Sequence, residues 1–366
     1  MGQEAKKFGK RVLLTYGRGS VKRIGLYDKV IKSLKAEGLE VFGLGGIQPN
    51  PRIDSVRQGV EICKKEGIEL ILAVGGGSTI DASKAIAAGA KYDGDPWDFY
   101  GYRVEVKDAL PLGTVLTLAA TGSEMNGNSV ISNWDTKEKL AISSIHLYPK
   151  FSILDPQNTF SVPKDHTVYG AVDILGHIFE QYFDSTPDTP LQDRMAEGLM
   201  KTVIETLPRI IADPSDYQAR AIMMWCGTMA LNNIIGCGKD EDWATHMIEH
   251  EISAIYDIPH GAGLAIVYPQ WMRYVLDEIP QKFARFARNV WNIREDVPEK
   301  ELGLMGIERT KAWFREMGAP VSLKEVGIDD RYIPEMARKA VARGPLGSAK
   351  KLHKEDVEQI LRMCLE

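Results

Sequence analysis

Four of the seven histidines, together with one aspartate, are spaced as the ligands of a metal ion would be. His177 follows Asp173 by four residues, which on a helix puts both side chains on one face, one turn apart. His246 and His250 have the same spacing, and a proline just before His260 is expected to end their helix and let that histidine turn back. Three imidazoles and one carboxylate suit a divalent transition metal such as Zn²⁺ or Fe²⁺, and ligand softness does not choose between these two.

Two simpler interpretations compete with this metal site. A single Asp-x-x-x-His pair is more often a surface pair or a local hydrogen bond, but two such segments in a histidine-poor chain are harder to explain in that way. Residues 246–250 also match H-x-x-E-H, an inverted zinc-peptidase motif in which Glu249 would be the general base for hydrolysis. That alternative leaves Asp173, His177 and His260 unexplained, so a metal site built from both segments is favoured.

A glycine-rich turn, Gly75-Gly76-Gly77-Ser78-Thr79, lies between an expected strand and an expected helix. Glycines let the backbone approach a ligand closely, and the N-terminus of the next helix offers unpaired N–H groups to a phosphate. The spacing is not G-x-G-x-x-G, so the usual dinucleotide fingerprint is absent. Ser78 or Thr79 could simply cap the helix, but the strand–helix context favours a site for a pyrophosphate.

A second polar turn, residues 117–124, also follows an expected strand. Its small hydroxyl residues, Thr117, Thr121 and Ser123, either face a cofactor or make local bonds to the backbone. Taken by itself, this turn favours the local bonds.

The elements that carry these turns alternate between strands and helices up to about residue 155. Such alternation predicts an α/β fold with a Rossmann-like, doubly wound parallel sheet. Beyond residue 160 the periodicity is helical, which predicts an all-helical second domain, so we expect domains at 1–160 and 161–366. Strands are expected at 11–16, 39–42, 68–74, 114–118 and 151–154, and helices at 25–37, 55–66, 81–89, 195–207, 217–234 and 280–291.

Composition narrows the class of protein. The 366 residues are 44% hydrophobic and 26% charged, as in an ordinary globular chain with material for two cores. The net charge of −5 argues against nucleic-acid binding, and there is no apolar run long enough to cross a membrane. The N-terminus lacks the apolar core of a signal peptide, so we expect a cytoplasmic protein. The four cysteines form no C-x-x-C pair and predict neither a disulfide framework nor a thiolate zinc site.

Taken together, these motifs resemble the iron-containing, or group III, alcohol dehydrogenases, and within them the branch of butanol dehydrogenases and broad aldehyde reductases. The resemblance runs from about Gly2 to the C-terminus and is carried by the GGGST turn with IDASKAIA, the TGSE turn, the Asp173/His177 pair and THMIEHEISAIYDIPHG. It implies a cofactor domain and a helical domain with the active site in the cleft between them. It also implies a homodimer, NADP or NAD as cofactor, one Fe²⁺ or Zn²⁺, and a short aliphatic alcohol or aldehyde as substrate.

The resemblance also assigns roles to individual residues. The metal would be bound by Asp173, His177, His246 and His260, and His250 would be a proton relay near the nicotinamide. The cofactor would be held at the pyrophosphate by Gly76, Gly77 and Ser78, near the ribose or adenine by Asn50, and elsewhere by Thr117, Thr121, Asn128 and Lys139.

Cofactor preference is expected to follow from the first turn, which includes Gly17, Arg18 and Ser20 and in this family approaches the 2′ position of the adenosine ribose. Relatives that prefer NAD often carry an aspartate there, whereas residues 16–22 contain no carboxylate. Arg18, the hydroxyl of Ser20 and Lys22 all suit an anionic group, so we expect NADP to be preferred. A solvated basic loop is the simpler alternative.

Other enzymes with the same fold are alternatives to this assignment. Glycerol dehydrogenases and dehydroquinate synthases are similar, but the second needs several basic residues around its anionic substrate. Here the segments around Asp173 and His246 carry Phe179, Trp243, Ile252 and Tyr256, which favours a short aliphatic substrate. A non-catalytic nucleotide-binding protein would not need four candidate metal ligands.

One departure from the family concerns the N-terminus. Members usually begin with a further segment that includes one more strand, and this sequence starts inside the helix after it. We therefore expect the edge of the cofactor domain to be less stable than in relatives.

Overall fold

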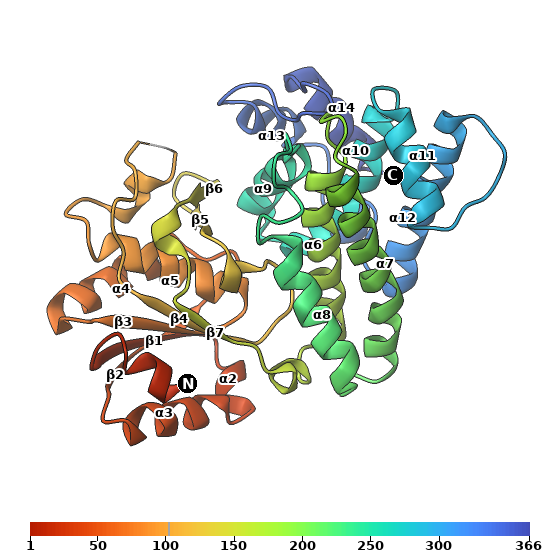
Figure 1. Cartoon of the computed structure of the whole chain (residues 1–366). Coiled ribbons are helices and arrows are strands. Elements are labelled where there is room, and N and C mark those ends of the chain that lie inside the picture. Colours follow the sequence, from red (N-terminus) through yellow and green to blue (C-terminus); the bar gives the residue numbers. More distant parts are fainter. Residues whose placement is uncertain (102) are drawn as a thin grey trace. The chain divides into compact units, whose positions relative to one another are not determined.

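The computed structural model describes residues 1–101 and 103–366 and divides the chain into two compact units, Met1–Val162 and Pro163–Glu366 (Figure 1). The first unit contains α1 (Gly2–Ala5), β1 (Arg11–Gly17), α2 (Ser20–Arg23), α3 (Leu26–Ala36), β2 (Glu40–Ile47), α4 (Ile53–Glu66), β3 (Leu70–Gly75), α5 (Gly77–Gly89), η1 (Pro96–Phe99), β4 (Leu112–Leu116), η2 (Ser123–Met125), β5 (Asn128–Asn133), β6 (Glu138–Ser143), η3 (Ile145–Leu147), β7 (Phe151–Ile153) and η4 (Pro156–Thr159).

A five-stranded parallel sheet forms the centre of the first unit, in the order β2-β1-β3-β4-β7. Every residue of β3 is buried, as expected for a strand covered on both faces. Figure 1 shows α2 and α3 on one side of the sheet and α4 and α5 on the other. Alternate residues therefore face different cores, and Val12, Leu14 and Leu72 pack with α3. The predicted doubly wound α/β fold is confirmed.

The chain reverses its direction across the sheet between β1 and β3. From β1 it moves outward to β2, then returns to place β3 on the other side of β1. Ligands of open parallel sheets bind beyond the carboxyl ends of the strands at such a reversal. The turns after β1 and β3 both lie there, and these are the two turns that carry Gly17 and Gly76.

The first unit also contains a hairpin that the sequence did not predict. Strands β5 and β6 pair antiparallel, with Ser132 opposite Lys139, and β5 packs against α5. Serine and asparagine at the ends of β5 hide its strand pattern, because these residues are typical of turns.

The second unit is helical. It contains α6 (Lys164–Tyr182), α7 (Pro190–Ala212), α8 (Tyr217–Ala230), α9 (Ala244–Tyr256), α10 (His260–Val275), α11 (Pro280–Asn289), α12 (Glu299–Met317), η5 (Lys324–Val326), α13 (Ile333–Ala340) and α14 (Lys354–Met363). In the part of the chain that the structure describes, no helix combines the length and apolar character needed to cross a membrane.

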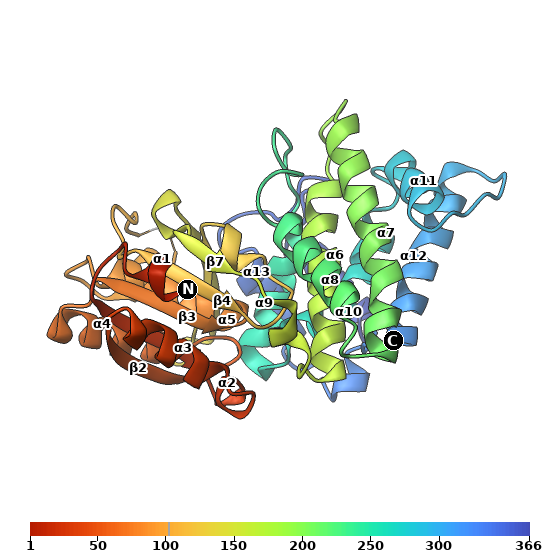
Figure 2. The same ribbon diagram turned by 60° about the horizontal axis from the view of Figure 1, so that its bottom comes forward.

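Helix α6 is the core helix of this unit. It packs against α7, α8, α9 and α10, and Figure 2 shows α6, α7 and α8 side by side. Nearly all residues from Thr167 to Tyr182 are buried, which is typical of a helix surrounded by others. Polar side chains on it must therefore find partners inside the protein.

Helices α11 and α12 approach each other through small residues. A Cβ added to Gly306 would lie 2.9 Å from Ala287 Cβ and 3.2 Å from Ala287 Cα. One at Gly303 would lie 2.8 Å from Phe283 Cβ. The two glycines therefore set the distance between these helices.

The same substitution is expected to have opposite effects at two helical glycines. Gly306→Ala should lower the free energy of unfolding by about 1–3 kcal/mol, because the backbone of α11 must move away. Gly198→Ala, on the exposed face of α7 with nothing within 4 Å, should raise it by roughly 0.5–1 kcal/mol through helix propensity. Denaturant unfolding of both variants measures the difference, and equal effects would contradict the close packing.

Candidate metal centre and cofactor site

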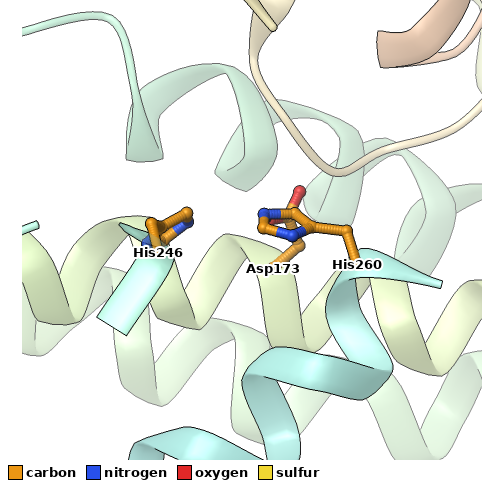
Figure 3. A group of neighbouring side chains, drawn as sticks. All are labelled: Asp173, His246 and His260. Carbon is orange, nitrogen blue, oxygen red and sulfur yellow. The ribbon is translucent and has the colours of Figure 1, made fainter. Parts of the chain in front are cut away.

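Three helices bring the predicted metal ligands together. Helix α6 carries Asp173, α9 carries His246, and α10 begins at His260. One ligand atom from each lies within 4.8 Å of the other two, and Figure 3 shows the three side chains converging from their helices. Ligand atoms that share a Zn²⁺ each lie about 2.0–2.2 Å from it, so small side-chain movements would close this group on one ion.

Two donor atoms of this group are buried and lack hydrogen bonds. Asp173 Oδ1 and His246 Nε2 have no hydrogen-bond partner in the part of the chain that the structure describes. The nearest polar neighbour of this carboxylate oxygen within the group, His260 Nε2, lies 3.5 Å away. Burying such atoms without partners is costly, and a bound cation would remove the cost. The residues present therefore fit a divalent metal.

His177, the fourth predicted ligand, lies beside this group of three. Its Nε2 is 3.7 Å from Asp173 Oδ1, and its ring centroid is 4.9 Å from that of His246. Burial lowers the pKa of His177 to about 3, although Asp173 opposes this shift. The imidazole is therefore neutral at neutral pH, which is the form that binds a metal.

Two buried glutamates orient two of the histidines, a role that sequence reasoning missed. Glu180 Oε1 lies 2.7 Å from His246 Nδ1, and Glu249 Oε2 contacts His260 Nδ1. A carboxylate that accepts the Nδ1 proton leaves the Nε2 lone pair for a metal. The spacing could have revealed both, because Glu180 follows His177 by three residues and Glu249 follows His246 by three, each on the same helix face.

A second candidate group consists of Glu249, His250 and His260. The carboxylate of Glu249 is engaged on both oxygens, by the Ser253 hydroxyl on one and by His260 Nδ1 on the other. This arrangement is that of a hydrogen-bond network rather than of a metal site. His250 is buried, with its ring 5.6 Å from that of His260, and so lies next to the Asp173 group.

Glycines next to the ligands allow the helices to approach. A Cβ on Gly261 would lie 2.1 Å from the carbonyl oxygen of Tyr169, so α10 starts against the backbone of α6. A Cβ on Gly176 would lie 3.5 Å from His246 Cε1. Larger residues at these positions would separate the helices that carry the ligands.

In the first unit, three turns meet at the carboxyl edge of the parallel sheet. A Cβ on Gly77 would lie 2.5 Å from Thr121 Oγ1, and one on Gly76 would lie 3.1 Å from Leu118 Cβ. One on Gly17 would lie 4.0 Å from Thr79 Oγ1. A side chain at Gly77 would force Thr121 to move, whereas the contact at Gly17 is an ordinary one. No side chain among the described residues caps the N-terminus of α5. The backbone N–H groups there form a cradle that fits a pyrophosphate.

The remaining predicted cofactor residues lie around these turns. Thr117 directly follows β4 and donates its backbone N–H to Gly75 O, and Ser78 is the second residue of α5. Arg18 and Ser20 follow Gly17, whereas Asn128 starts β5. Asn50 and Lys139 are both buried near Ser132, which pairs with Lys139 and donates its N–H to Pro51 O.

The turn after β1 differs from the sequence-based expectation in one respect. The ammonium of Lys22 lies 4.9 Å from the centre of the Tyr16 ring and 5.0 Å from that of Tyr27. Lys22 is therefore engaged by two aromatic rings, and Arg18 and Ser20 are left as the groups of this turn that suit an anion.

The chain matches two family models that together cover most of its length. Residues 1–156 match iron-containing alcohol dehydrogenases, and residues 167–365 match the C-terminal domain of the same family. The chain belongs to the iron-containing alcohol dehydrogenase family. Membership makes it an oxidoreductase that uses a nicotinamide cofactor and a divalent metal.

Individual relatives of this dehydrogenase are similar over nearly the whole chain. The probable NADH-dependent butanol dehydrogenase 1 of Bacillus subtilis is 53% identical, with 99% of this chain and 94% of the relative covered. The NADPH-dependent aldehyde reductase YqhD of Escherichia coli is 41% identical over 91% of this chain and 86% of the relative. The crystal structure of NADH-dependent butanol dehydrogenase A from Thermotoga maritima, 45% identical, covers 100% of this chain and 94% of its own, with a TM-score of 0.97.

The two glutamates can be tested by metal affinity alone. Glu180→Gln and Glu249→Gln should each weaken Zn²⁺ binding by about 10- to 100-fold, because an amide cannot accept the Nδ1 proton as strongly as a carboxylate. Exposed Glu205→Gln on α7 is the matched control. Competition with a chelator measures the dissociation constants, and wild-type affinity in both variants would show that the glutamates do not orient the ligands.

Proposed function

We propose that this chain is a metal-dependent alcohol dehydrogenase and aldehyde reductase that acts on short aliphatic substrates. In this proposal Met1–Val162 binds the cofactor and Pro163–Glu366 binds the metal and the substrate. The observation that carries the proposal is the group of Asp173, His246 and half-buried His260, in which two buried donor atoms have no hydrogen bond. The names of the relatives, butanol dehydrogenases and an aldehyde reductase, support the substrate class.

The chemistry divides between the bound groups and the protein. When bound, the metal supplies a Lewis acid to the substrate oxygen and the nicotinamide supplies or accepts the hydride. Asp173, His177, His246 and His260 hold the metal, and Glu180 and Glu249 keep two of these imidazoles in the required tautomer. His250 carries the proton that the alcohol oxygen gains or loses.

The side chain best placed to favour an apolar substrate is Trp243. Its ring lies edge-on to His246, with centroids 5.2 Å apart, and 6.3 Å from His177. Phe179 and Ile252, which the sequence also suggested, are instead fully buried in the helical core. The indole therefore supplies the apolar surface next to the ligands and helps to exclude water from them.

Two histidines on the same helix are expected to behave differently. His246→Ala should lose both metal and turnover, because it removes a ligand. His250→Ala should keep the metal while turnover falls by about 10²-fold, a typical size for one acid–base group. Metal analysis and aldehyde reduction of the two proteins, prepared anaerobically, measure both effects. If His250→Ala lost as much metal as His246→Ala, His250 would be a ligand. If His246→Ala kept full activity, His246 would not belong to the site.

For the cofactor we propose that NADPH is preferred. Residues 16–22 and 43–52, the two segments at the β1 and β2 ends, contain no carboxylate to repel a 2′-phosphate. Arg18 reaches from the first segment to Gln48 Oε1 of the second, at 3.1 Å, and is exposed. The names of the relatives do not decide between the two cofactors, because the Bacillus protein is called NADH-dependent and YqhD NADPH-dependent.

The ratio of kcat/KM for NADPH and NADH tests this preference. One charge-assisted hydrogen bond is worth about 1.5–3 kcal/mol, so Arg18 could shift the ratio by about 10- to 150-fold. Arg18→Asp adds repulsion and should reverse the preference. Arg23→Asp makes the same charge change on the exposed face of α2 and should leave the ratio unchanged. A wild type that favours NADH, or an Arg18→Asp ratio equal to the control's, would exclude this turn as the selector.

A further inference from the structure

Lys84 is a completely buried lysine on α5, a rare position for this residue type. Its Nζ lies within hydrogen-bond distance of four oxygen atoms. These are Ser123 Oγ at 2.9 Å, Asn126 O at 2.8 Å, Asn126 Oδ1 at 3.0 Å and Asn128 O at 2.8 Å. All four belong to the segment 123–128, which follows directly on the turn that carries Thr121.

The partners of Lys84 require its charged form. Three of the four oxygens are carbonyls, which only accept hydrogen bonds. The fourth, Ser123 Oγ, donates its own proton to Asp81 Oδ1 and so can only accept from Lys84. An ammonium offers three N–H donors, whereas a neutral amine offers two and turns a lone pair toward the remaining oxygens. The contacts are therefore those of an ammonium.

Lys84 and Gly77 hold the two ends of one loop. They are seven residues apart on α5, which is two turns along the same face. At Gly77 the helix touches Thr121, and at Lys84 it binds the backbone of Asn126 and Asn128. The loop 121–128 thus lies along α5, whose first turn forms the proposed pyrophosphate site.

We propose that Lys84 is a positioning residue for the nicotinamide cofactor, because its ammonium holds the loop 121–128 against α5 in the shape in which Thr121 and Asn128 meet the cofactor. This inference rests on the proposed function, since it assumes that a dinucleotide binds at these turns. It assigns a role to a residue that the catalytic chemistry does not use.

The charge on Lys84 makes cofactor binding sensitive to pH. Burial lowers the pKa of Lys84 from 10.5 to about 8, and the carboxylates of Asp81 on α5 and Glu124 on η2 oppose this shift. Tyr100, which bonds to Ser129 near Asp81, has its own pKa raised by burial and stays neutral here. Above about pH 8 the ammonium is lost and the loop is held less well. Cofactor affinity should fall there.

The free energy of unfolding should change with pH in the direction opposite to cofactor affinity. Between pH 8 and 10.5 the unfolded chain binds the proton of Lys84 more strongly than the folded chain does. This group therefore makes the free energy of unfolding rise with pH over that interval. A fall in cofactor affinity over the same interval cannot then be explained by loss of the fold through Lys84.

The experiment compares Lys84→Met with Lys91→Met in the full chain. Both remove one lysine charge, but Lys91 is exposed just after α5. Fluorescence titration should show that Lys84→Met binds NADH and NADPH roughly 10-fold or more weakly, the size expected for hydrogen bonds to a charged group. Lys91→Met should match the wild type. Zn²⁺ affinity should be unchanged in both, because the ligand group belongs to the other unit.

A pH series completes the test. From pH 7 to about 9.5, NADH binding to the wild type and to Lys91→Met should weaken at least several-fold, while Lys84→Met should change little. A pH-independent wild type, or a Lys84→Met protein with wild-type affinity, would overturn the proposal. If Lys84→Met does not fold, the wild-type series decides alone. A wild type that binds neither NADH nor NADPH would refute the proposed function itself, which is a separate result.

Discussion

The carboxylate of Asp173 is buried on a helix surrounded by apolar neighbours, and the helical unit is arranged around that constraint. A buried carboxylate without partners is too costly to keep, so the fold must bring compensating groups to it. It does so by crowding α9 and α10 onto α6, at Gly176 and at Gly261, where a side chain would not fit. The imidazoles of these helices lie close to the Asp173 carboxylate but beyond hydrogen-bond distance. A cation is therefore left to compensate its charge.

The buried residues that contact the predicted ligands are subject to the same constraint. His246 and His260 are oriented by Glu180 and Glu249, which are themselves fully buried. These carboxylates add negative charge close to Asp173, and mutual repulsion would destabilise the unit without a positive partner. A divalent metal bound there would therefore stabilise the helical unit as well as take part in the chemistry, because it would neutralise this cluster of carboxylates.

Sequence reasoning predicted the groups of residues that depend on local spacing and missed those that depend on packing. The i, i+4 pairs and the glycine turn after β3 could be predicted because one helical turn or one strand–helix junction fixes them. The role of Lys84 could not, since IDASKAIA gives no sign that its partners arrive from a loop about 40 residues later. Similarly, the two rings that engage Lys22 come from β1 and α3, and only the fold brings them to one side chain.

One of the strained backbone positions of the helical unit lies beside the ligand group. Trp243 precedes α9 with φ 60°, a left-handed conformation that costs a bulky residue about 1–3 kcal/mol. Its indole N–H donates to Glu241, and its ring contacts His246 edge-on. These two contacts of the side chain hold Trp243 in the strained conformation. A relaxed backbone at this position would swing the indole away from the imidazoles. The fold thus accepts a local cost to keep an apolar side chain beside the polar Asp173 group, as the proposed function requires for separating a small alcohol or aldehyde from water.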